Sequence, residues 1–154
     1  MPHLTIKGED FQARTDFKFE RMANDKYNTE EDGQKIGGFM SIYLRLLQFE
    51  NEAIVQFWDC ALAHYKKDKP IVEDIEEALY SRIEQDGDTE KLLQEAFTTL
   101  DKSGFFLKRV KSIWKDFAAT PETKKNETEE QKVAREEQEQ TAKIMQDRRS
   151  ELLL

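Results

Sequence analysis

Residues 51–67, NEAIVQFWDCALAHYKK, repeat apolar side chains with the period of an α-helix. The apolar positions follow the spacing i, i+3, i+4, i+7, i+8 and i+11, and they are Ile54, Phe57, Trp58, Ala61, Leu62 and Tyr65. A stripe of this kind covers one face of a helix, and that face must be buried against other parts of the chain. Asn51 is a suitable N-cap, and Pro70 prevents the helix from continuing. The chain is therefore expected to build a core around this helix.

Helical spacing recurs up to Phe117 and predicts about six helices. The predicted helices cover residues 17–27 with Asp16 as cap, 39–49, 51–67, 72–83, a segment from the cap Asp88 to Leu100, and a last segment from Phe106 to Phe117. Between the first two, residues 28–38 are expected to form a loop that ends in a flexible joint at Gly37–Gly38.

The N-terminal segment HLTIKGEDFQAR alternates with a period of two instead. Leu4 and Ile6 precede a turn at Gly8, and Phe11 and Ala13 follow it. This pattern predicts a short β-hairpin, which must pack on the helices because an isolated hairpin is only marginally stable. The expected fold class is mainly α (α+β), with a short N-terminal β-hairpin, about six helices and a charged C-terminal tail.

Composition changes near Ala119. All ten Phe, both Trp and all four Tyr precede this point, whereas residues 120–154 are mostly Glu, Gln, Lys, Arg and Thr. A core needs apolar surface, so we predict a compact, mostly helical domain over 1–119 and a charged tail over 120–154, helical or partly disordered. Thr120–Pro121 suits the start of a tail helix. The final three leucines are expected to fray or, less commonly, to bind a partner.

The charge balance argues against several function classes. The formal net charge is -8, which repels polyphosphate, so nucleic acid is not an expected partner. No apolar run approaches the roughly 18 residues of a membrane span. The start, MPHLTIKGED, lacks the basic and apolar regions of a secretory signal, so no such signal is expected. No membrane partner is expected either. The single cysteine, Cys60, fits a reducing cytoplasm.

Residues that could carry chemistry do not form a catalytic or metal-binding pattern. Cys60 and His64 share a helix face, but a zinc site needs three or four ligands and the other histidine is the distant His3. A calcium loop that starts at Asp86 would need Gly at its sixth position and Glu at its twelfth, but the chain has Lys91 and Phe97 there. No serine lies in a nucleophile elbow. We therefore expect no enzyme, no catalytic residues, no metal and no cofactor.

Residues 100–117, LDKSGFFLKRVKSIWKDF, combine aromatic residues with a local excess of lysine. Helical spacing separates an apolar stripe from the lysines, which lie on the other face. The stripe either closes the core, which is the interpretation that we favour, or docks an apolar helix of a partner. The candidate partner-binding residues are Phe105, Phe106, Val110, Trp114 and Phe117.

The order of segments is informative beyond any single motif. LTIKGEDF leads into DFKFERMAND, a Gly-Gly pair follows, and then come AIVQFWDCALAH, KKDKPIVEDIEEAL and SGFFLK. Over roughly residues 4–118, this order resembles the tail assembly chaperones of long-tailed phages (siphophages) and prophages of Gram-positive bacteria.

The resemblance implies a non-enzymatic chaperone in phage tail morphogenesis. Such a protein would bind the tape measure protein, keep it soluble and help to recruit tail tube subunits. The resemblance also implies self-association into an oligomer or spiral. The expected location is the cytoplasm of the infected or lysogenic bacterial host, and not the mature virion. The alternative is another small helical adaptor or regulatory protein of a phage or mobile element.

Overall fold

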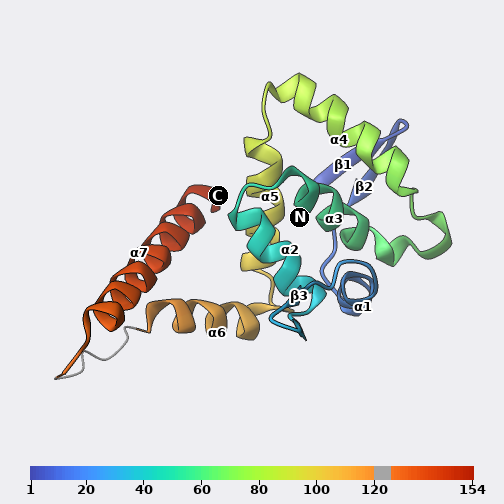
Figure 1. Cartoon of the computed structure of the whole chain (residues 1–154). Coiled ribbons are helices and arrows are strands. Elements are labelled where there is room, and N and C mark those ends of the chain that lie inside the picture. The colour runs from blue at the N-terminus through green and yellow to red at the C-terminus, as the bar shows by residue number, and fades with distance from the viewer. Residues whose placement is uncertain (120–125) are drawn as a thin grey trace.

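The computed structural model describes residues 1–119 and 126–154, and it is mainly α-helical (Figure 1). The strands are β1 (His3–Ile6), β2 (Glu9–Gln12), β3 (Glu30–Glu31) and β4 (Gln34–Lys35). The helices are α1 (Phe17–Lys26), α2 (Gly38–Leu47), α3 (Asn51–Ala61), the short 3-10 helix η1 (Ala63–Asp68), α4 (Val72–Asp86), α5 (Glu90–Asp101), α6 (Leu107–Ala118) and α7 (Glu129–Leu152). The predicted fold class, mainly α with a short N-terminal hairpin, is confirmed.

The N-terminal hairpin forms as its alternation predicts. β1 and β2 are antiparallel, with Leu4 opposite Phe11. Lys7 and Gly8 form the turn with positive φ angles of 50° and 80°, the backbone geometry of a type I′ hairpin turn. Leu4, Ile6 and Phe11 are buried, and α4 packs along β1 (Figure 1). The hairpin is therefore stabilised by its apolar face on the helices.

The predicted helix over 51–67 is wrong at its C-terminal end. α3 stops at Ala61 and η1 follows with a different geometry. The change lets this segment contact the hairpin, because the Tyr65 hydroxyl accepts a hydrogen bond from the Gln12 backbone N–H at 3.0 Å. The His64 ring also lies within hydrogen-bonding distance of the Gln12 carbonyl oxygen, at 2.8 Å. These tertiary contacts override the local helical periodicity.

Gly38 serves a close contact between two helices, so the prediction of a flexible joint is wrong at this residue. α2 begins at Gly38, directly against the backbone of α1. A Cβ atom on Gly38 would lie 2.0 Å from the carbonyl carbon of Ala23. The Gly38 N–H donates to the Asn24 side-chain oxygen at 2.9 Å. Only a residue without a side chain allows this approach.

Replacing Gly38 with alanine is expected to lower the free energy of unfolding by about 1–3 kcal/mol or more, because α1 and α2 must separate. Chemical denaturation followed by circular dichroism measures the change. Gly104→Ala is the matched control, since its added Cβ would meet no atom within 4 Å. Equal unfolding midpoints for the two variants would contradict the role assigned to Gly38.

A stack of aromatic rings joins several helices in the core. Phe106 stacks on Phe39 with ring centroids 4.1 Å apart, and Phe39 continues to Tyr43 at 5.4 Å. Tyr43 in turn stacks on Phe97 of α5 at 4.9 Å, and Phe19 of α1 contacts Phe106 at 5.7 Å. The stack holds α1, α2, α5 and the start of α6 in one core.

The tail segment contains one long helix whose end returns to the core. α7 starts with a capping box in which the side chains of Thr128 and Gln131 each accept the other's backbone N–H. The predicted start at Thr120–Pro121 lies outside the described residues. α6 and α7 extend to one side of the molecule, and the C-terminal end of α7 reaches α5 and α2 (Figure 1). Leu152 is only 2% exposed, so the expectation of a frayed end is wrong there.

Candidate partner-binding groove

The apolar stripe of α6 mostly closes the core. Of the five candidate partner residues, Phe106, Val110 and Trp114 are buried. Ile113 of the same stripe is also buried. The favoured interpretation of the stripe is therefore confirmed for these positions, and their side chains are not available to a partner in this structure.

The other two candidates keep exposed surface at opposite ends of α6. Phe105 is 36% exposed and makes an edge-to-face contact with Phe17 at 4.9 Å. It borders a hollow of about 590 Å³ that also has charged walls, among them Glu95 and Lys102. Phe117 is half-buried and lines a separate, more apolar groove. The structure thus does not bring the five candidates into one surface.

The groove beside Phe117 lies between α2, α6 and α7 and has a volume of about 440 Å³. Its lining residues are Met40 and Leu44 from α2, Ile113, Asp116 and Phe117 from α6, Ala119, and Gln138, Thr141 and Ala142 from α7. The α2 side is apolar, and the α6 side combines two apolar residues with the carboxylate of Asp116. The α7 side presents small or uncharged polar residues. A groove of this shape suits bulky apolar side chains from one face of a partner helix.

Sequence reasoning missed most of this groove. Met40 and Leu44 are four residues apart and therefore share a helix face beside the main stripe of α2. That spacing is a signal that could have identified them as a second apolar strip. Gln138, Thr141 and Ala142 have no such signal, since they are ordinary residues of a charged helix.

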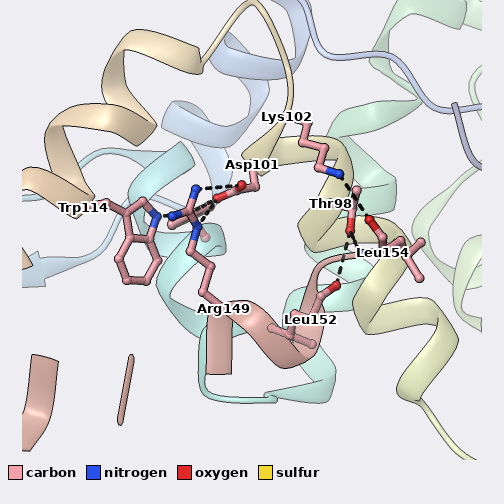
Figure 2. Close-up of polar contacts among 8 residues, drawn as sticks. Thr98, Asp101, Lys102, Trp114, Arg149, Leu152 and Leu154 are labelled. Atoms are coloured by element: carbon pink, nitrogen blue, oxygen red, sulfur yellow. Dashed lines mark hydrogen bonds and ion pairs between the residues drawn. The ribbon is translucent and has the colours of Figure 1, made fainter. Parts of the chain in front are cut away.

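Trp114, whose ring packs on the groove residue Phe117, takes part in a buried polar chain (Figure 2). Its indole N–H donates to the Tyr43 hydroxyl at 2.7 Å, and that hydroxyl donates to the Asp101 carboxylate. Burial, together with the hydrogen bond to Asp101, raises the pKa of Tyr43, so the phenol keeps the proton that it donates. The Arg149 guanidinium of α7 also binds Asp101 and covers the Trp114 ring, 4.7 Å from its centroid.

The surroundings of Cys60 disfavour a reactive thiol. Cys60 is buried, and burial raises the pKa of its thiol, which disfavours the reactive thiolate. Within residues 1–119 and 126–154, no group of three or more His, Cys, Asp and Glu side chains is placed to hold a metal ion. In the same described ranges, no helix combines the length and apolarity needed to cross a membrane.

Comparison with known proteins places this fold in a family. Neither a curated protein nor a solved structure gave a significant match. A family model described as "Phage tail assembly chaperone protein, TAC" matches residues 3–115, which run from the N-terminal hairpin into α6. Since this match spans most of the sequence, the chain belongs to the phage tail assembly chaperone family.

Proposed function

We propose that this chain is a non-enzymatic chaperone that binds the tape measure protein and keeps it soluble before the tail is assembled. It would act in the cytoplasm of the bacterial host, help to recruit tail tube subunits and leave before the virion is complete. Self-association along a long client belongs to the same proposal. Family membership supports the general role, and the groove between α2, α6 and α7 is the single observation that carries the proposed client contact.

The physical problem is the apolar surface of an unassembled helical client. A tape measure helix that exposes an apolar stripe is prone to aggregate. The groove offers the half-buried side chains of Met40, Leu44 and Phe117 as apolar contacts for such a stripe. The net charge of -8 would then give a coated client a repulsive, soluble exterior.

Co-expression with the tape measure protein of the same phage tests this proposal. Leu44→Glu is expected to reduce the amount of co-purified tape measure protein by about tenfold or more, because a carboxylate would be buried in the apolar contact. Tyr80→Glu is the matched control, since Tyr80 is 60% exposed on α4, outside the groove. Circular dichroism checks that both variants fold.

Two results would contradict the proposal. A tape measure protein that is equally soluble without this chain, and that forms no complex with it, would exclude the function. Undiminished binding by a folded Leu44→Glu variant would exclude the groove as the client site. Addition of tail tube protein to the purified complex tests the recruitment step, for which a ternary complex is expected.

A further inference from the structure

The last residues of the chain bind a site formed by Thr98, Asp101 and Lys102 of α5 and its C-cap and by Trp114 of α6, here named the socket (Figure 2). Asp101 of α5 is only 4% exposed, yet both of its oxygens are bound by Arg149. Nε and Nη2 of Arg149 each lie 3.1 Å from one oxygen, which is the bidentate geometry that arginine forms with carboxylates. The same guanidinium lies over the Trp114 ring and makes a cation–π contact with it.

The residues after Arg149 are bound through both side-chain and main-chain contacts. Leu152 inserts its side chain into the core, and the Thr98 hydroxyl donates to its carbonyl oxygen at 3.2 Å. The same hydroxyl accepts the backbone N–H of Leu154 at 3.1 Å. Lys102 donates to the Leu154 oxygen at 3.2 Å. The socket therefore recognises a guanidinium, an apolar side chain and the following main chain together.

The remainder of α7 is held much less firmly. Val133 and Ile144 are exposed, and the contacts of α7 with the core cluster come from Met145 and the residues beyond it. Arg148 adds a hydrogen bond of 3.4 Å to the Leu47 carbonyl oxygen near the same end. The position of the whole helix thus depends on its C-terminal turns.

This dependence matters because α7 forms one wall of the groove. Gln138, Thr141 and Ala142 line the groove opposite Leu44 and Phe117, without filling it. We propose that the Arg149–Leu154 end, here named the clasp, binds the socket of its own chain. This docking holds α7 in place as one wall of the client site. The inference rests on the proposed function, and it concerns a part of the chain beyond the residues that the family model matches.

The occupant of the socket is the chain's own clasp in cis. The hydrogen bonds above join residues of one chain, and the groove that Gln138, Thr141 and Ala142 line is open while α7 is docked. A clasp released from the socket would leave Leu44 and Phe117 with one open side. The client would then lose the contacts of the α7 wall.

Hydrogen exchange of the full chain, followed by mass spectrometry, tests the docking. Protection of the amides of residues 145–154 is expected at every protein concentration. Arg149→Ala and Leu152→Asp should lose that protection, while α1–α5 keep theirs. Ile144→Asp is the matched control on the exposed face of α7, and it should behave as the unmodified chain does. Protection that appears only at high protein concentration would overturn the assignment in cis and indicate exchange of α7 between copies.

Binding of the same variants to the co-expressed tape measure protein tests the consequence. Both clasp variants are expected to bind about tenfold more weakly, and Ile144→Asp is expected to bind normally. Unchanged or stronger binding after loss of protection would overturn the inference, because α7 would then not be a wall of the client site. An unmodified chain that fails to bind the tape measure protein would overturn the proposed function instead, with the docking still decided by hydrogen exchange.

Discussion

Replacing Trp114 with alanine is expected to lower the free energy of unfolding by about 3–5 kcal/mol, the usual cost of a large aromatic-to-alanine change in a core. The side chain is 8% exposed and packs on Phe117 with ring centroids 5.3 Å apart. Its loss would leave a cavity and remove the N–H that Tyr43 accepts, as well as the ring that Arg149 covers. Chemical denaturation measured by circular dichroism gives the change.

Two controls separate the contributions to this effect. Trp114→Phe keeps an aromatic ring and removes the hydrogen bond to Tyr43, so it should cost less than the alanine variant. Tyr80→Ala on α4 should stay within about 0.5 kcal/mol, since Tyr80 is largely exposed. An unchanged unfolding midpoint for Trp114→Ala, together with lost client binding, would mean that the α6 stripe is a docking face and not part of the core.

Asp59 gives the second large expected effect. Its carboxylate is fully buried and binds three groups: the Tyr27 hydroxyl at 2.6 Å, the Lys26 amine at 3.0 Å and the Lys69 amine. Asp59→Ala would leave the mostly buried amine of Lys69 without its counter-charge. Loss of one partner from a buried ion pair typically costs about 3–5 kcal/mol, and we expect a change of this size in chemical denaturation. Lys26→Ala is the control, and it should cost less because that side chain is about half exposed.

The same carboxylate predicts a pH dependence of stability. Burial by itself raises the pKa of Asp59, but the hydrogen bonds from Lys69, Tyr27 and Lys26 outweigh it and hold the pKa below its usual value. The stabilisation is therefore present above the unfolded-state pKa of about 3.9 and is lost as the pH falls through the lower folded-state pKa. Asp59→Asn should accordingly lose less stability than the unmodified chain as the pH falls below about 4. Parallel pH profiles for the two proteins would contradict this assignment.

Local patterns in the sequence predicted most of the elements and the broad fold class, although residues 28–38, expected as a loop, contain the short β3–β4 hairpin. The period of 3.6 located α1 to α6, the period of two located the β1–β2 hairpin, and most of the apolar stripe of α6 was correctly assigned to the core. These predictions succeed because each depends on residues close together in the chain, and because an apolar stripe must be buried somewhere. The end of the helix predicted over 51–67 failed, since contacts with Gln12 decide the backbone there.

The groove and the clasp depend on contacts between distant segments. Leu44 and Ala142 line one groove from positions almost a hundred residues apart, and Asp101 binds Arg149 across 48 positions. In the sequence, Asp101 and Arg149 are ordinary charged residues, and nothing local indicates that one of them is buried. Asp59 is similar, because its burial follows from the way α1 and Lys69 close over α3.

The sequence by itself determined most of the helical segments up to Phe117, the faces of them that must be buried and the family pattern that the chain follows. The tertiary structure alone decided which apolar residues remain open to a client and where the last residues of the charged tail bind. The physical reason is that burial of an apolar stripe is favourable against any complementary surface. The choice of surface comes from close packing and from paired buried charges, such as Gly38 on Ala23 and Arg149 on Asp101, whose partners meet only in the folded chain.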